Sequence, residues 1–361
     1  MTTLPAIEVS ASEPAALPRA HARDALWLGL GVVVLFASML AGLFVGAVDI
    51  PPQDIVGDLV SRMPLVSMHS PLSHVDQAIV WQLRLPRVVL GALVGGMLAL
   101  CGAAYQGIFR NPLADPYLLG VASGAGLGAT IAIVFAINFT FLDFQALPLL
   151  AFIGAVLAVG LAYVVGRSVG AGRSSTTLVL GGVAVAAFLT AMQTFIQQRH
   201  TEQLQLVYNW ILGSVATAGW GQVTTMLPYA LLALVVILLH GRLLDVMGLG
   251  DDAARTLGVR TNRVRLAVIG AVTIGTAAAV AVSGLIGFVG LIIPHVVRLL
   301  GVRTHRTLLP LSMLLGASFL VLCDLIARTV VSPSELPIGV VTAVIGAPCF
   351  ALVLRTSRVE A

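Results

Sequence analysis

The sequence predicts an all-α polytopic membrane protein with ten transmembrane helices. Of its 361 residues, 58% are hydrophobic and only 10% are charged, and the mean hydropathy is +1.01. Soluble domains carry about 25% charged residues, so this composition excludes a soluble enzyme and a nucleic-acid-binding protein. Apolar segments long enough to cross a bilayer recur along the chain, and the lipid bilayer is therefore its expected environment.

The chain divides into a tail and a transmembrane domain. Residues 1–24 are rich in Ala, Pro and Ser and are expected to be disordered, and residues 25–355 form the transmembrane domain. The ten candidate spans are 25–47, 88–109, 118–137, 145–166, 176–197, 222–241, 264–283, 285–300, 308–327 and 336–354.

Two segments depart from a regular span. The eighth candidate, 285–300, is short and is interrupted by glycine and proline, which membrane helices tolerate where they face protein or a cavity. The apolar segment 206–218 is too short to cross the bilayer and is expected to form a re-entrant or surface helix.

Glycine spacing predicts close helix packing. Gly120, Gly124 and Gly128 repeat at four-residue intervals, as do Gly91 and Gly95 in the preceding span. Since lipid offers no hydrophobic drive for helix association, small residues allow the backbone contacts that hold such helices together. A pore-lining role would give the same spacing.

The arginine distribution predicts the orientation. All 20 basic residues are arginine, and basic residues favour the cytoplasmic side of a membrane. Ten spans with both termini in the cytoplasm leave five arginines in outer segments and the other fifteen inside. The five outer arginines are Arg62, Arg84, Arg87, Arg199 and Arg328.

Several chemistries are absent from the sequence. Without lysine, the chain has neither a Walker A loop nor a Schiff-base nucleophile. Its three cysteines and seven histidines form no ligand pattern, so we expect no catalytic site, no metal site and no cofactor. Asp324 is the main ionisable residue within a span, and Arg328 lies four residues later, on the same helix face. An ion-gradient-driven secondary transporter that uses Asp324 remains the alternative from another functional class.

The loop between the sixth and seventh spans predicts a short helix. Asp251 and Asp252 suit a helix N-terminus, and Gly258 suits its end. Small side chains between them would let this helix lie in a groove of another protein. The alternative interpretation is a plain interfacial helix.

The outer arginines form a second candidate site. Arg84 and Arg87 flank a Leu-Pro pair just outside the second span. Together with Arg328 they predict an exposed basic patch that binds carboxylates through charge-assisted hydrogen bonds. Anchoring in lipid headgroups is the alternative.

Six motifs in order resemble one family, the permease subunits of type II ABC importers, which take up cobalamin, haem and iron–siderophore complexes. The motifs are RLPRVVLGALVGG at 84–96, FRNPLADPYLLGVASGAG at 109–126, GLGDDAARTLGV at 248–259, GLIGFVGLIIPHVVR at 284–298, HRTLLP at 305–310 and ELPIGVVTAVIGAP at 335–348.

This resemblance implies a homodimer of ten-helix subunits, with two ATP-binding subunits beneath it and a substrate-binding protein on its outer face. The binding protein's acidic residues would meet Arg84, Arg87 and Arg328. An inner gate would lie at Ser174, Ser175, Thr176 and Thr177. A coupling helix at about 249–258 would engage the ATPase through Leu249, Gly250, Asp251, Asp252, Ala253, Ala254, Leu257 and Gly258.

The resemblance also sets the expected function and location. The chain would be a non-enzymatic, multi-pass subunit in the bacterial cytoplasmic membrane, with ATP hydrolysis on a separate chain. We expect its cargo to be an iron complex, either a ferric siderophore or haem, with cobalamin as the alternative. No nucleic acid is expected as a partner.

Overall fold

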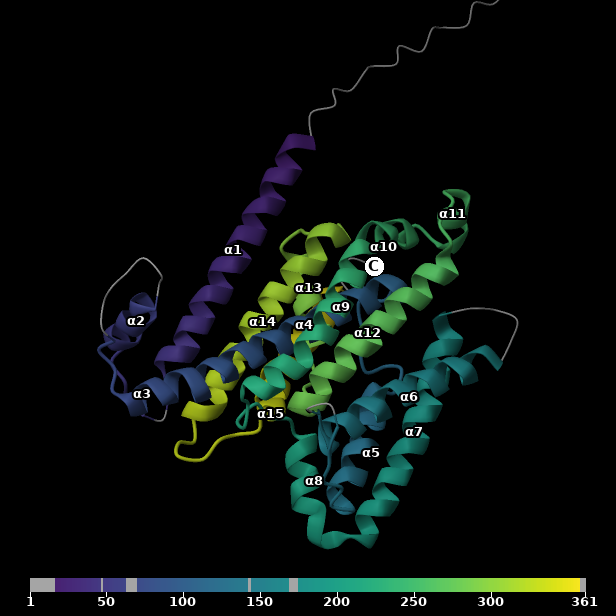
Figure 1. Ribbon diagram of the computed structural model, residues 1–361. Coiled ribbons are helices and arrows are strands. Elements are labelled where there is room, and N and C mark those ends of the chain that lie inside the picture. Colours follow the sequence, from purple (N-terminus) through teal and green to yellow (C-terminus); the bar gives the residue numbers. More distant parts are fainter. Residues whose placement is uncertain (1–16, 47, 63–69, 142–143, 169–174, 358–361) are drawn as a thin grey trace, which may run out of the picture.

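The computed structural model describes residues 17–46, 48–62, 70–141, 144–168 and 175–357, and most of them are helical (Figure 1). Its helices are α1 (Leu17–Phe44), α2 (Pro52–Ser61), α3 (His74–Ala78), the π-helical turn η1 (Ile79–Arg84), α4 (Leu85–Phe109), α5 (Val121–Val134), α6 (Ala146–Ser168), α7 (Ser175–Arg199), the 3₁₀ turn η2 (Thr201–Gln203), α8 (Leu204–Ile211), α9 (Trp220–Leu239), α10 (Gly241–Gly248), α11 (Asp251–Thr256), α12 (Thr261–Ser283), α13 (Val289–Leu299), α14 (His305–Thr329) and α15 (Ile338–Ser357). Two short strands, β1 (Thr140–Phe141) and β2 (Phe144–Gln145), pair antiparallel.

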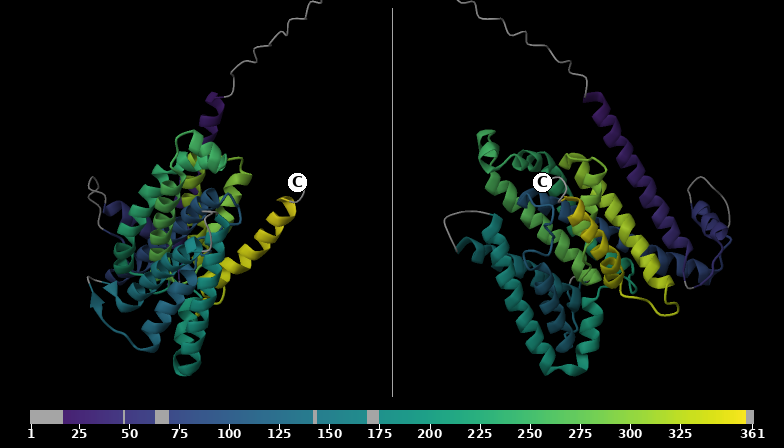
Figure 2. Two further views of the ribbon diagram at one scale, coloured as in Figure 1. Left: turned by 90° about the vertical axis from the view of Figure 1, so that its right-hand side faces the viewer. Right: turned by 180° about the vertical axis from the view of Figure 1, so that it is seen from behind.

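The long helices run between two ends of one bundle, which we name the α11 end and the α8 end after the short helices found there (Figure 1). The N-terminus of α1 and the C-terminus of α15 both point toward the α11 end (Figure 2). A chain that crosses the membrane an even number of times has both ends on the same side. The arrangement of the two ends therefore agrees with an even number of spans.

Helix length supports most of the expected spans. Seven helices in the described residues are long and apolar enough to cross a membrane. The remaining three candidate spans correspond to shorter apolar helices, and the total of ten spans stays a prediction. These shorter helices are Val121–Val134, Val289–Leu299 and Ile338–Leu352.

The bundle is built around α4, which is buried along most of its length. In the most apolar part of the span that contains it, 83% of the residues are buried, against 22% in α1 and 22% in α7. A side chain on Gly95 would overlap the backbone of Gly316 in α14, and one on Gly102 would overlap the carbonyl of Gly290 in α13. Small residues thus allow α4 to touch its neighbours backbone to backbone.

The glycine repeat of α5 has the same role. Side chains on Gly124 and Gly128 would overlap the carbonyl groups of Gly154 and Leu150 in α6. The predicted packing role is therefore confirmed for this pair of helices.

The eighth candidate span is interrupted as expected. Backbone from Gly284 to Phe288 is not helical, with φ of +70° at Gly284 and +69° at Phe288, and α13 begins only at Val289. The short segment after α7 forms α8, a helix of 8 residues, in line with its predicted inability to cross.

The N-terminal tail is shorter than predicted. We expected disorder over 1–24, but α1 begins at Leu17. Its first turns are attached to the bundle because Arg23 donates to the carbonyl of Gly301 at 2.9 Å and Thr307 donates to Asp24 at 2.8 Å. Residues 1–16 lie outside the described residues.

A second, smaller hydrophobic cluster joins α2 and η1 at the α8 end. Asp58 of α2 is only 1% exposed, and it accepts hydrogen bonds from Ser70 at 2.5 Å, Trp81 at 2.6 Å and Arg62 at 3.3 Å. Burial acts to raise the pKa of Asp58, but these donors outweigh it and hold the pKa below its ordinary value. The carboxylate therefore fixes α2 against the start of the α4 span.

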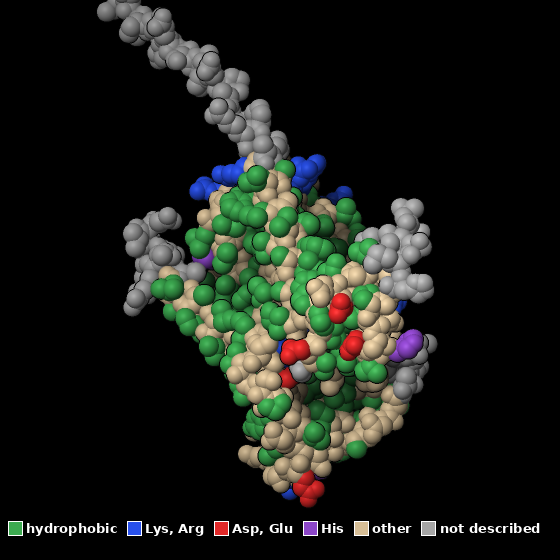
Figure 3. All heavy atoms as spheres, turned by 90° about the vertical axis from the view of Figure 1, so that its left-hand side faces the viewer, with side chains coloured by type: hydrophobic (Ala, Val, Ile, Leu, Met, Phe, Trp, Pro, Cys, Tyr) green, Lys and Arg blue, Asp and Glu red, His purple; other side chains and the backbone are tan. Residues whose placement is uncertain are grey.

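The face drawn in Figure 3 is mostly apolar, with arginine side chains gathered at its top, where α1 begins, and a few acidic side chains lower down. A mostly apolar surface is the one expected of a protein that a bilayer surrounds.

Candidate functional site

The predicted short helix is present at the α11 end. Gly250 precedes it with φ of +111°, and Gly258 follows it with φ of +83°. The amide of Val259 bonds to the carbonyl of Ala254 at 2.9 Å, which closes the helix around Gly258. Gly258 thus ends α11 as the sequence predicted, and the two acidic residues lie in its first turn without a side-chain cap hydrogen bond.

Asp251 holds α11 in place through two arginines. Its carboxylate accepts from Arg265 of α12 at 3.0 and 3.2 Å, and Arg110, just after α4, lies 3.7 Å away. The Arg265 side chain is 7% exposed, so this ion pair is partly shielded from water. Asp251 therefore connects α11 to α12 and to the end of α4.

Two leucines beside α11 are exposed at the surface. Leu249 is 69% exposed and Leu257 is 64% exposed, whereas Ala254 between them is fully buried. The Asp252 side chain, at 99% exposure, also faces outward. Exposed leucines next to a charged, anchored helix are typical of a surface that another protein covers.

Asp245 and His305 form another contact at the α11 end, which the sequence did not predict. Asp245 of α10 accepts from the backbone amide of His305 at 2.8 Å, and its carboxylate lies 2.6 Å from Nδ1 of the same histidine. Burial acts to raise the pKa of Asp245, but the hydrogen bonds from His305 outweigh it and lower the net pKa. This contact connects α10 to the start of α14.

The three outer arginines, hereafter the arginine cluster (Arg84, Arg87 and Arg328), do come together at the α8 end, around one cavity of about 360 Å³. They are not the exposed patch that we expected. Arg84 is 5% exposed, and it donates to the carbonyl groups of Leu43, Phe44 and Val48. The end of α1 therefore encloses this guanidinium.

Arg87 binds two carboxylates at once. It contacts Asp324 of α14 at 2.8 to 3.0 Å and Glu335, in the loop before α15, at 2.8 and 2.9 Å. The predicted pair of Asp324 and Arg328 is also present, with 3.7 Å between Nε and Oδ2. Arg328 donates in addition to the carbonyl of Gly42 at 2.6 Å.

The burial and pairing of the arginine cluster have a simple physical cause. An arginine without a counter-charge is costly at the edge of the hydrocarbon layer, and carboxylates or free carbonyl groups of other elements reduce that cost. Of the two carboxylates that bind Arg87, Glu335 is the accessible one, with a side chain 37% exposed against 4% for Asp324. The hydrogen bond from Arg87 holds the pKa of Glu335 below its ordinary value.

The candidate gate residues are only partly described. Ser174 lies outside the described residues, and Ser175 is the first residue of α7. Thr176 is exposed and Thr177 is half-buried. Near them α6 and α7 approach closely, since a side chain on Gly166 would come within 3.0 Å of the carbonyl oxygen of Thr177.

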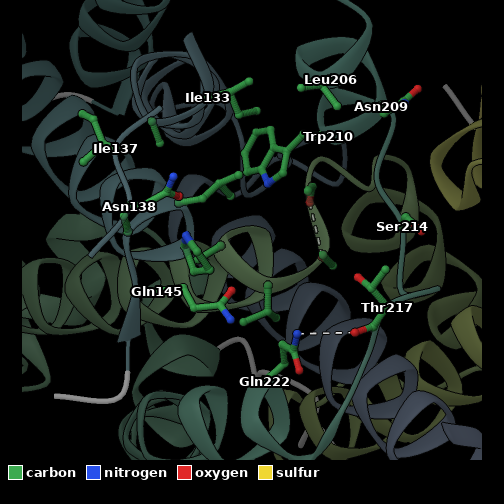
Figure 4. Close-up of a pocket in the computed structure, with 18 of the residues that line it drawn as sticks. Ile133, Ile137, Asn138, Gln145, Leu206, Asn209, Trp210, Ser214, Thr217 and Gln222 are labelled. Carbon is green, nitrogen blue, oxygen red and sulfur yellow. Dashed lines mark hydrogen bonds between the residues drawn. The ribbon is translucent and has the colours of Figure 1, made fainter. Parts of the chain in front are cut away.

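A large cavity opens beside α8 (Figure 4). Its volume is about 1130 Å³. Trp210 projects its indole ring into this space, and Gln145, Asn138 and Gln222 approach it from other elements (Figure 4). Every described residue that lines the cavity is uncharged, so it offers neutral hydrogen-bonding groups and apolar surface. The sequence did not point to this cavity, because its lining comes from five separate segments.

Among the described residues, no group of three or more His, Cys, Asp or Glu side chains could hold a metal ion. Cys101 and Cys323 are buried free thiols, and Cys349 is an exposed one.

Comparison with known proteins gives consistent matches. Residues 33–356 match the FecCD transport family. The uncharacterized ABC transporter permease protein YvrB of Bacillus subtilis is 41% identical over 334 residues, which cover 90% of this chain and 92% of that protein. The vitamin B12 import system permease protein BtuC of Klebsiella pneumoniae is 37% identical, with 93% and 95% covered.

Two further matches concern metal chelates. The Fe(3+)-citrate import system permease protein YfmE of Bacillus subtilis is 34% identical, covering 93% of this chain and 97% of that protein. A solved inward-facing conformation of an ABC transporter assigned to the metal-chelate type has a TM-score of 0.78 and 31% identity, covering 91% of this chain and 98% of the other.

The family match spans nearly all of the transmembrane domain, and the fold agrees with it along almost the whole of the solved chain. The chain therefore belongs to the FecCD transport family, and it is a membrane protein of the type II ABC importer permease group that its six motifs resemble.

Proposed function

We propose that this chain is the membrane-spanning subunit of an ATP-driven importer that carries an iron complex, either a ferric siderophore or haem, across the bacterial cytoplasmic membrane. It acts as a homodimer, with two ATP-binding subunits at the α11 end and a substrate-binding protein at the α8 end. Both termini then lie in the cytoplasm. The observation that carries this proposal is the anchored helix α11 between two exposed leucines.

Coupling to an ATPase follows from the contacts of α11. A partner that binds Leu249 and Leu257 moves α11, and the carboxylate of Asp251 passes that movement to Arg265 and Arg110. Arg265 belongs to α12, whose 23 residues span about 35 Å. A displacement at the α11 end is therefore carried toward the α8 end by a stiff element.

The inner gate is proposed at Ser174 to Thr177. Ser175, Thr176 and Thr177 belong to the first turn of α7, which begins at the end of that helix nearer to α11 (Figure 1). Close packing of α6 and α7 at Gly166 supports movement of the two helices together, as a gate requires.

Two observations support this cargo: the names of the relatives, and the uncharged lining of the cavity beside α8. Relatives of this chain include permeases named for Fe(3+)-citrate and for vitamin B12, so cobalamin is the alternative cargo. The uncharged cavity beside α8 suits a bulky chelate whose polar groups need only weak contacts, because tight binding would slow release.

The alternative of a secondary transporter driven by an ion gradient would use Asp324 as a proton relay. Asp324 is 3% exposed and is bound by Arg87 and paired with Arg328. Both arginines therefore engage this carboxylate in ion pairs within the bundle. The contacts thus favour a structural role for Asp324.

Uptake in a deletion strain tests the cargo. Cells that lack the gene are complemented with the chain and supplied in turn with ⁵⁵Fe-siderophore, ⁵⁵Fe-haem and ⁵⁷Co-cobalamin. We expect ATP-dependent accumulation of an iron label. Accumulation of cobalamin alone would replace the proposed cargo, and uptake that survives ATP depletion but fails in Asp324→Asn would favour the secondary transporter.

A further inference from the structure

Glu335 occupies a position that an incoming carboxylate would need. Its two carboxylate oxygens face the two terminal nitrogens of Arg87 at 2.8 and 2.9 Å, which is the paired geometry typical of arginine–carboxylate recognition. The Nε atom of Arg87 donates to both carboxylate oxygens of Asp324. Both terminal nitrogens of Arg87 are therefore already bonded to a carboxylate.

The two carboxylates on Arg87 differ in how easily they leave. The Asp324 side chain is 4% exposed and belongs to α14, which ends five residues later at Thr329. The Glu335 side chain is 37% exposed, and it belongs to the connection between α14 and α15. A competitor from outside can therefore displace Glu335 but not Asp324.

The cavity of about 360 Å³ beside this pair leaves room for such a competitor. Arg84, Arg87, Arg328 and Glu335 all line it. Guanidinium groups therefore line this cavity, and a carboxylate is the group that an arginine binds in paired geometry.

Glu335 is also attached to the start of α15. Leu336 donates to Ala327 at 2.9 Å, and Ile338, the first residue of α15, donates to the carbonyl of Gly213 at 3.1 Å. Only two residues separate Glu335 from α15. Release of Glu335 thus removes a side-chain contact from the connection that leads into α15.

We propose that Glu335 is an internal substitute for a partner's carboxylate: it occupies Arg87 in the resting permease, and an acidic side chain of the substrate-binding protein displaces it and frees the start of α15. This inference depends on the proposed function, since it assumes that the binding protein docks at the α8 end. It adds a competition step that couples docking to movement of a membrane helix.

The first experiment needs no partner protein. A nitroxide is placed on the exposed residue Ser334 (S334C) in a variant whose one exposed thiol is removed (C349S), and the chain is studied in lipid nanodiscs. We expect Glu335→Gln to increase the mobility of the label. Hexaglutamate should do the same in the chain that keeps Glu335, and hexalysine should not.

The matched control is Glu202→Gln, which removes the same charge from an exposed site at the α8 end, in η2. Glu202 lies outside the arginine cluster, and its variant should leave the label unchanged. Equal mobility in the two variants, or no response to hexaglutamate, would overturn the internal competition.

The second experiment measures docking. The substrate-binding protein that delivers the cargo identified by the uptake experiment is titrated onto the immobilised transporter. Because Glu335→Gln removes the competitor, we expect about five-fold tighter binding than in Glu202→Gln, equivalent to about 1 kcal/mol. Unchanged affinity would refute displacement by the partner.

The two experiments separate the inference from the function on which it depends. If the label responds but the binding protein engages no variant, docking at the arginine cluster fails and the substitute role of Glu335 fails with it. If the binding protein docks normally and the label does not respond, only the competition step is wrong.

Discussion

The contact between Asp251 and Arg265 gives the sharpest prediction about coupling. Asp251→Asn keeps the shape of the side chain and removes the charge that holds Arg265. Breaking a buried ion pair costs about 3 to 5 kcal/mol. The Asp251 side chain is 26% exposed, so water compensates part of that loss, and we expect a decrease of about 2 kcal/mol in the free energy of unfolding.

The matched control is Asp252→Asn in the next position of the same helix. The Asp252 side chain is 99% exposed, and its partner Arg255 lies 3.6 Å away with 54% exposure. Exposed pairs of this kind contribute little, so no measurable change in stability is expected. Unfolding in mixed micelles of sodium dodecyl sulfate compares the two variants.

A double-mutant cycle of Asp251→Asn with Arg265→Gln isolates the pair, and we expect a coupling energy of about 1 to 2 kcal/mol. In the assembled transporter, Asp251→Asn should lower cargo uptake per ATP hydrolysed. If Asp251→Asn and Asp252→Asn behave alike in stability and in uptake, then Asp251 does not transmit movement and the route through α12 is wrong.

Three further predictions test the packing and the buried charges. Gly102→Ala should destabilise the chain by about 1 to 3 kcal/mol, because the added carbon meets the backbone of α13. Gly160 has open space around it, so Gly160→Ala should be neutral or slightly stabilising in the same unfolding assay. Burial raises the pKa of Asp115 to about 6 from an ordinary value of 3.8, so the folded state holds this proton more tightly. The free energy of unfolding should therefore fall by up to about 3 kcal/mol as pH rises from about 4 to 6. Asp115→Asn should remove that pH dependence, and a variant that keeps it would refute the assignment. The pKa of Asp58 is lowered, so this carboxylate should contribute stability above its ordinary pKa, and that stability should be lost as pH falls below it. Asp58→Asn should expose the backbone of α2 to hydrogen exchange at pH 7. Unchanged exchange would show that Asp58 does not fix α2 in place.

Local features of the structure were predictable from the sequence. The extent of α11 agrees with the acidic residues in its first turn and with Gly258 just after its end, because the helix dipole and a glycine C-cap act within about one turn. The glycine repeat of α5 likewise predicted its close contact with α6. Both signals are short-range patterns that one segment carries by itself.

Long-range partners were not predictable. Arg84 was expected at the surface, but the carbonyl groups that enclose it belong to α1 and the segment after it, about forty residues earlier. Glu335 lies 248 positions from Arg87, and nothing in either local sequence indicates that they pair. The sequence predicted that Arg84, Arg87 and Arg328 lie together, as they do, yet only the packing of α1, α4 and α14 decides which of them remain accessible.

In the proposed function, this chain provides a path and a partner ATPase provides the energy. Proteoliposomes that contain the chain alone, loaded with neither ATPase nor ATP, are compared with proteoliposomes that contain the chain, its ATP-binding subunits, its binding protein and ATP, and uptake of the radiolabelled cargo is measured against a concentration gradient. We predict uphill accumulation only in the complete system. Uphill accumulation by the chain alone under an imposed ion gradient would contradict the account.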